Sequence, residues 1–122
     1  MKVLLDTHVF LWFVLGQDQC SKATRALIES PSNNCVVSIA SIWEIAIKHA
    51  LGKLDLHQPI SDFFDTFEQG GFAPVPINSS HILTLASLPL HHRDPFDRIL
   101  IAQAKTEGMH LLSAGRPAFC AV

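Results

Sequence analysis

The chain has 122 residues, of which 48% are hydrophobic and 16% charged, and its net charge is −2 at pH 7. This composition excludes a disordered chain, and the charge balance excludes a strongly basic surface of the kind that coats nucleic acid. The length suits one domain, so we expect residues 1–122 to form a single unit. Cys20, Cys35 and Cys120 form no CxxC pair, which favours free thiols in a reducing compartment.

The apolar opening MKVLLDTHVFLWFVLG is similar to the start of a secretory signal peptide. However, Asp6 and His8 interrupt it, and no small-residue cleavage site follows Gly16. No stretch of the sequence reaches the ~18 uninterrupted apolar residues of a membrane span. We therefore expect a soluble, cytoplasmic protein that does not associate with a membrane.

Hydrophobic periodicity and turn residues divide the first half of the chain into strands and helices. Residues 2–5 and 35–37 are short apolar runs, and we expect the first to be a central strand buried on both faces. Ser21 fits the N-cap of a helix. The expected helices cover residues 9–15, 22–29 and 38–51.

The second half continues the alternation of helices and strands. Residues 60–69 predict an amphipathic helix, and the Pro-interrupted segment 72–77 predicts an edge strand. The remaining elements are helices over 80–88 and 95–107 and a last strand over 109–112. This order predicts the α/β class, as a three-layer α/β/α sandwich with a mostly parallel central sheet.

Asp6 follows directly after the first expected strand. Ligands of open parallel sheets bind beyond the carboxyl ends of the strands, so this position would place Asp6 at the ligand-binding edge. Asp is also a good N-cap for a following helix. Both explanations of Asp6 stay open.

Two further acidic positions have competing explanations. Glu44 lies beside the apolar stripe of SIASIWEIAIK, where it fits a capping box with Ser41 or an i,i+4 pair with Lys48. Asp94 and Asp97 open the helix of RDPFDRILIAQA, where the helix dipole favours acids. Carboxylates at three such positions predict a pocket of oxygens suited to a hard divalent cation such as Mg²⁺ or Mn²⁺.

Three segments carry a family resemblance: MKVLLDTHVFLW, SIASIWEIAIKHALGKL and LPLHHRDPFDRILIAQA. In order and spacing they resemble the motifs of PIN-domain ribonucleases, and among these the VapC-like toxins of bacterial toxin–antitoxin operons. The resemblance implies a PIN fold, Mg²⁺- or Mn²⁺-dependent endoribonuclease activity on RNA, an antitoxin partner and a homodimer. It also implies catalytic and metal-binding roles for Asp6, Glu44, Asp97 and the neighbouring Asp94.

The end of the chain departs from the family pattern. A fourth acid normally follows the last strand, and here Gly115 stands at that position. Two functions therefore stay open. The chain is an active nuclease in which Asp94 partly compensates, or it is a catalytically weak or inactive PIN domain that binds RNA or protein.

Arg93, Arg98 and Lys48 are candidates for contacts with the RNA backbone, as basic side chains are for phosphates generally. A solvated helix face explains such residues equally simply. His91 and His92 lack the H-E-x-x-H or Cys/His pattern of a zinc site, so we expect them to be loop residues near the RNA.

Trp12, Phe13 and Trp43 occur at helical spacing among apolar neighbours. This pattern predicts that they lie in the core or in an interface before it predicts platforms for stacking bases. An apolar surface formed by Trp12 and Phe13 would suit a dimer or an antitoxin groove.

Overall fold

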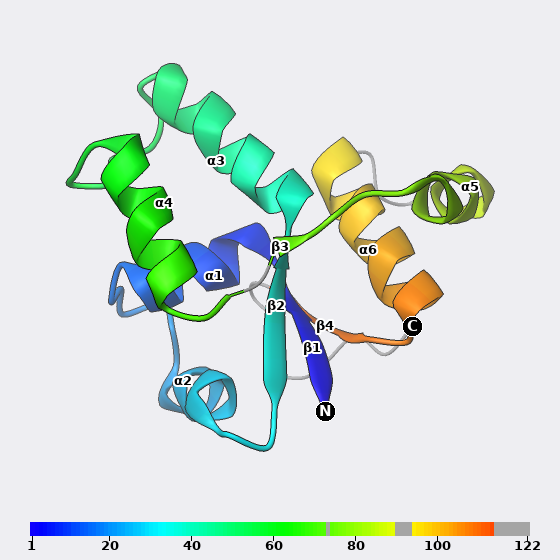
Figure 1. The fold of residues 1–122 in the computed structure, drawn as a ribbon, viewed down its shortest axis with the longest axis horizontal. Coiled ribbons are helices and arrows are strands. Elements are labelled where there is room, and N and C mark those ends of the chain that lie inside the picture. The colour runs from blue at the N-terminus through cyan, green and yellow to red at the C-terminus, as the bar shows by residue number, and fades with distance from the viewer. Residues whose placement is uncertain (73, 90–93, 114–122) are drawn as a thin grey trace.

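A computed structural model describes residues 1–72, 74–89 and 94–113 of the chain (Figure 1). Within these residues four strands form one sheet in the order β3-β2-β1-β4. Strand β1 pairs with both β2 and β4, strand β2 pairs with β3, and every pairing is parallel. The strands are β1 (Lys2–Leu5), β2 (Asn34–Ser38), β3 (Pro74–Val75) and β4 (His110–Leu112).

The described residues also form six helices, which cover both faces of the sheet. Figure 1 shows α1 to α4 on one side of the strands and α5 and α6 on the other, so the predicted α/β sandwich is confirmed. The helices are α1 (Thr7–Val14), α2 (Lys22–Glu29), α3 (Ile39–Ala50), α4 (Ile60–Gln69), α5 (Ser79–Ser87) and α6 (Pro95–Glu107).

Strand β1 contributes to a hydrophobic cluster on each face of the sheet. Val3 and Leu5 belong to the cluster under α1 to α4, whereas Leu4 belongs to the cluster under α6. Successive side chains of a strand point to opposite faces, so all three are fully buried, as expected for a central strand. The larger cluster is centred on Phe10, whose ring meets those of Phe67 and Phe72 edge to face at 5.3 and 5.4 Å.

The predicted elements differ from the structure mainly at their ends. Helix α1 begins two residues earlier than expected, at Thr7, because the Asp6 side chain caps it. Helix α3 is capped by Ser38, whose hydroxyl accepts a hydrogen bond from the Ala40 amide at 3.0 Å. The alternative in which Ser41 caps α3 in a capping box with Glu44 is therefore wrong. The expected edge strand is an edge strand, but it is only two residues long.

The structure also tests the expected ends of the last helix, the place of Trp43, the thiols and the membrane spans. Helix α6 begins with Pro95 and ends before Gly108, which has φ 65°, a conformation that glycine adopts without strain. Trp43 does not lie in the core, because 61% of its surface is exposed. Cys20 and Cys35 are free thiols, and Cys120 lies outside the described residues. Among the described residues, no helix has both the length and the hydropathy needed to cross a membrane.

The Phe10 cluster generates a stability prediction. Phe10→Ala removes a fully buried ring at the centre of the larger core, and we expect it to lower the free energy of unfolding by about 3–5 kcal/mol. Phe64→Ala is the matched control, because the Phe64 ring is only partly buried at the edge of the same cluster. Urea unfolding followed by circular dichroism measures both losses. Equal losses would contradict the central position of Phe10.

Candidate active site

Asp6 lies where β1 meets α1, at the carboxyl edge of the sheet. Its backbone amide donates to the Leu112 carbonyl at 3.0 Å, so β4 fixes the position of the residue. Its carboxylate accepts a hydrogen bond from the His8 amide at 2.8 Å and caps α1. Both explanations of Asp6 therefore hold together: the acid caps a helix and lies at the edge where α/β proteins bind ligands.

His8 is a basic neighbour of Asp6. Its Nδ1 lies 3.6 Å from the Asp6 carboxylate, and its ring tilts against Trp12 at a centroid distance of 6.2 Å. The hydrogen bond with Asp6 raises the pKa of His8, against the lowering effect of partial burial. The His8 side chain remains half exposed, so it is not packed under the helix.

Glu44 is a buried acid on α3, with only 5% of its surface exposed. Its Oε2 lies 2.8 Å from the Nζ of Lys48, one turn further along the helix. The predicted i,i+4 pair is therefore present. A buried carboxylate without a partner would be strongly unfavourable, so this ion pair allows the charge to remain at that position.

Asp94 and Asp97 begin α6. Asp94 is its N-cap and accepts a hydrogen bond from the Phe96 amide at 2.8 Å. Partial burial raises the pKa of Asp97, and the charges of Asp94, Asp6 and Glu44 raise it further. The four predicted acids therefore come from three separate parts of the chain and share one electrostatic environment.

The four acids do not form a ready-made cation site in the described part of the chain. Among the residues that the structure describes, no three His, Cys, Asp or Glu side chains are close enough together to hold a metal ion. Asp6 and Asp94 are oriented by the helices they cap, and Glu44 by Lys48. Gly115, at the position of the expected fourth acid, lies outside the described residues. The metal-binding roles of the four acids stay predictions.

A buried hydrogen bond that the sequence analysis missed joins the two helices that carry Asp6 and Glu44. The Thr7 hydroxyl donates to the Ser41 hydroxyl at 2.8 Å, and both residues are buried. Thr7 follows Asp6 directly, and Ser41 precedes Glu44 by almost one helical turn. The bond therefore fixes the start of α1 relative to α3. Its only signal in the sequence is a hydroxyl beside each acid in an apolar stretch.

The candidate RNA-binding residues have other contacts or lie outside the described part of the chain. The Arg98 guanidinium donates to the Pro89 and Leu85 carbonyls at 2.9 and 3.0 Å, which ties the end of α5 to α6. Lys48 pairs with Glu44. Arg93, together with His91 and His92, falls outside the described residues. The RNA contacts of all three basic residues stay predictions.

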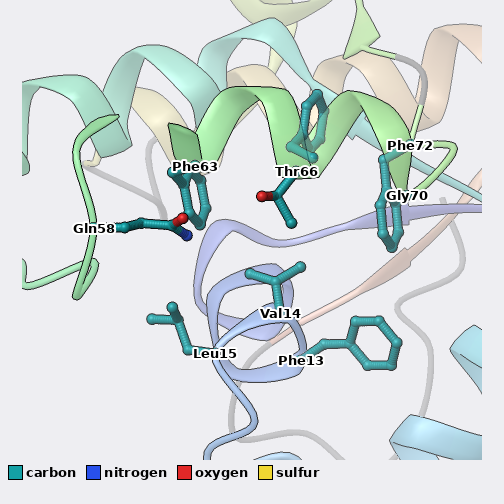
Figure 2. Close-up of a pocket in the computed structure, with 9 residues that line it drawn as sticks. Phe13, Val14, Leu15, Gln58, Phe63, Thr66, Gly70 and Phe72 are labelled. Carbon is teal, nitrogen blue, oxygen red and sulfur yellow. The ribbon is translucent and has the colours of Figure 1, made fainter. Parts of the chain in front are cut away.

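An apolar cavity of about 300 Å³ lies between α1 and α4, away from the acids (Figure 2). Figure 2 shows Val14 and Leu15 of α1 facing Phe63 and Thr66 of α4, with Phe13 and Phe72 at the other end. None of the four acids lines this cavity. Phe13 also packs beneath the Arg25 guanidinium, 4.9 Å from the ring centroid.

The chain matches the family model of the PIN domain over residues 3–121, and it therefore belongs to the PIN domain family. It is 36% identical to Ribonuclease VapC16 of Mycobacterium tuberculosis over 59 residues, which make up 48% of this chain and 42% of that protein. The match thus spans less than half the length of this relative. A chain of a toxin-antitoxin complex from Klebsiella pneumoniae has the same fold, with a TM-score of 0.61 at 17% identity, over 94% of this chain and 92% of that one.

The raised pKa of Asp97 generates a prediction about stability and pH. Folding makes ionisation of Asp97 less favourable, so the residue begins to cost stability above the ordinary aspartate pKa, and the cost is complete above the raised pKa. Asp97→Asn should raise the free energy of unfolding at pH 7.5 by up to about 1 kcal/mol, a limit set by solvent screening. The gain should shrink as the pH falls towards the ordinary aspartate pKa of about 3.9.

Thermal unfolding of the metal-free protein across this pH range measures the effect. Asp65→Asn is the matched control, because Asp65 is an exposed aspartate on α4 outside the acid cluster. An equal gain for both variants, or a gain that does not depend on pH, would contradict the electrostatic origin.

Proposed function

We propose that this protein is a metal-dependent endoribonuclease that hydrolyses phosphodiester bonds of RNA. The observation that carries the proposal is that Asp97 is near acids from three elements, whose charges add to the larger effect of burial in raising its pKa. Membership of the PIN domain family and the partial match to a ribonuclease support it. We further propose that the protein acts in the cytoplasm as a toxin, and that a small antitoxin protein is its partner.

The residues present fit a divalent cation. PIN-domain ribonucleases generally depend on divalent metals, and Mg²⁺ and Mn²⁺ select carboxylate and water oxygens. Burial and the charges of the neighbouring acids raise the pKa of Asp97, so a cation that neutralises these carboxylates would stabilise the protein. Asp6, Glu44, Asp97 and Asp94 would hold the ion.

When bound, a divalent ion would activate water and offset the charge that develops on the phosphodiester. Asp6 and Asp94 are oriented by the helices they cap, so they supply oxygens in fixed positions. Glu44 is buried, which keeps solvent from that side of the site. Asp97 is exposed at the start of α6, so its carboxylate would be open to an ion that enters from solvent.

The second candidate function is a PIN domain that binds RNA without cutting it. It is favoured by Gly115 at the position of the expected fourth acid, and by the absence of a preassembled cation site among the described residues. The two functions differ in what the protein does to RNA when a divalent ion is present.

An RNA cleavage assay with Mg²⁺, Mn²⁺ or EDTA tests the proposal. We expect cleavage with either ion, none with EDTA, and a loss of at least about 100-fold in Asp6→Asn, because electrostatic stabilisation of the transition state is lost. Asp55→Asn is a matched control. Asp55 accepts a hydrogen bond from the amide of His57, two residues on, as Asp6 does from that of His8, but its side chain is exposed.

Equal losses in the two variants would contradict the site assignment. Binding of intact RNA by folded protein, without cleavage under any metal, would favour the second candidate function.

We also propose that two copies of the chain associate through an apolar face formed by α3 and α5. The exposed large apolar side chains of the described residues, apart from Met1, all lie on α3, at its C-cap or on α5. Those of α3 recur every four residues and form one stripe along the helix. The residues of this face are Ile39, Trp43, Ile47, Leu51, Ile82 and Leu83.

Trp43 of α3 and Ile82 of α5 line one cavity of about 210 Å³. Phe96 of α6 lines it too, and its ring meets that of Trp43 edge to face at 5.3 Å. At roughly 150 Å² for each fully exposed side chain, the face exposes on the order of 500 Å² of apolar surface. A stable dimer buries about 800 Å² per partner, so the face supplies more than half of that area.

Light scattering after gel filtration tests the dimer. We expect the wild type to show twice the monomer mass, and Leu83→Asp to show the monomer mass, because a charge at a side chain that is 73% exposed prevents apolar association. Gln69→Asp places a new carboxylate on the exposed surface of α4 and should leave the dimer intact. A monomeric wild type would contradict the proposal.

A further inference from the structure

The ion pair between Glu44 and Lys48 differs from an ordinary surface pair in where its two members lie. The Glu44 side chain is 6% exposed, whereas the Lys48 side chain is 38% exposed. The carboxylate is therefore confined to the interior, whereas the lysine side chain is partly open to solvent. Because a buried carboxylate needs a counter-charge, one cation must accompany Glu44 in the folded protein.

We propose that Lys48 is the internal counter-ion of Glu44 in the metal-free protein, and that a divalent cation displaces it from this carboxylate. The inference rests on the proposed metal-dependent function, because it concerns the ion that Glu44 would help to hold. Lys48 then has a positioning role at the site, because it controls how Glu44 meets a cation. Its ion pair does more than stabilise α3.

The first argument is electrostatic. An ammonium 2.8 Å from Oε2 already offsets the charge of Glu44, so the carboxylate attracts a second cation less strongly. A divalent ion bound to Glu44 would also repel the ammonium at short range. The two cations therefore compete for Glu44, and each should be bound less tightly when the other is present.

The second argument is the mobility of the two side chains. Glu44 is buried and lies on the turn of α3 that Ser41 joins to Thr7 through a buried hydrogen bond, so the backbone that carries its side chain is held in position. Lys48 has a flexible stem and a partly exposed ammonium, which can move into solvent while the stem stays on the helix. Displacement of Lys48 therefore needs a side-chain rotation and no change of the backbone.

The third argument concerns the other acids. Asp6 also has a basic neighbour, His8, whose Nδ1 lies 3.6 Å from its carboxylate. Two side-chain bases thus offset part of the negative charge of the acid cluster before any metal arrives. Once displaced into solvent, the Lys48 ammonium can contact an RNA phosphate, because its stem stays on the helix.

Calorimetric titration with Mn²⁺ and thermal unfolding with and without Mn²⁺ test this role in Lys48→Gln. We expect the variant to unfold at a lower temperature without metal, because Glu44 loses its partner. It should bind Mn²⁺ about tenfold more tightly, because the competing cation is gone. The rise in unfolding temperature on adding Mn²⁺ should therefore exceed that of the wild type.

Three further variants complete the design. Lys53→Gln removes an exposed lysine just beyond α3 and should leave both measurements unchanged. Lys48→Arg keeps the positive charge and should bind Mn²⁺ no more tightly than the wild type. Lys48→Met keeps the apolar stem without the charge, and it replaces Lys48→Gln if that variant does not fold.

The outcomes separate this inference from the proposed function. If Lys48→Gln lowers the unfolding temperature but binds Mn²⁺ with wild-type affinity, the ion pair is only structural and the inference is overturned while the nuclease proposal stands. If neither the wild type nor the Lys48 variants bind Mn²⁺, the metal-dependent function itself fails, and the inference fails with it.

Discussion

The parallel pairing of β1 with β2 and β4 aligns Leu5 with Val37 on one side and with Leu112 on the other. Because all three strands run in the same direction, they end at one edge of the sheet. Asp6 and Ser38 then cap α1 and α3 from adjacent positions at that edge. The acid cluster therefore depends on strand register, and a slip of one residue would turn Asp6 to the opposite face.

The acids of the cluster also contribute to the fold that holds them. Asp6 and Asp94 each cap a helix through the side chain that the proposed function assigns to a cation. Their capping hydrogen bonds stabilise the folded state, whereas the partial burial of Asp97 and the negative charges around it raise its pKa and so destabilise that state. The buried aromatic cluster around Phe10 stabilises the fold, and the fold keeps these charged side chains in place.

Local patterns in the sequence were sufficient for most elements and for the helix-capping role of Asp6. The run Lys2–Leu5 has no polar residue between its apolar side chains, as a strand buried on both faces requires. Pro95 and Gly108 mark the ends of α6 because each has a backbone preference that suits its end of a helix. Such signals involve only neighbouring residues, so they do not depend on how the rest of the chain folds.

Features that depend on distant neighbours could not be predicted in this way. Thr7 and Ser41 are 34 residues apart, and nothing local indicates that their hydroxyls meet. The apolar spacing around Trp43 identified a helix, but it could not show that one apolar side of that helix stays uncovered. Ser41 matched a capping box, yet Ser38 at the end of β2 is the N-cap, because the strand ends there. Arg98 bonds to backbone carbonyls, which carry no sequence signature.

The pair of Glu44 and Lys48 shows why a correct local pattern can leave function undecided. On an exposed helix, an acid and a lysine four residues apart contribute only a few tenths of a kcal/mol and have no further consequence. Here the packing of α3 buries the acid and leaves the base partly exposed, so the same spacing produces one fixed charge and one movable charge. The sequence determines that the two side chains meet. The fold determines which of them can leave, and that asymmetry is what a competing cation would act on.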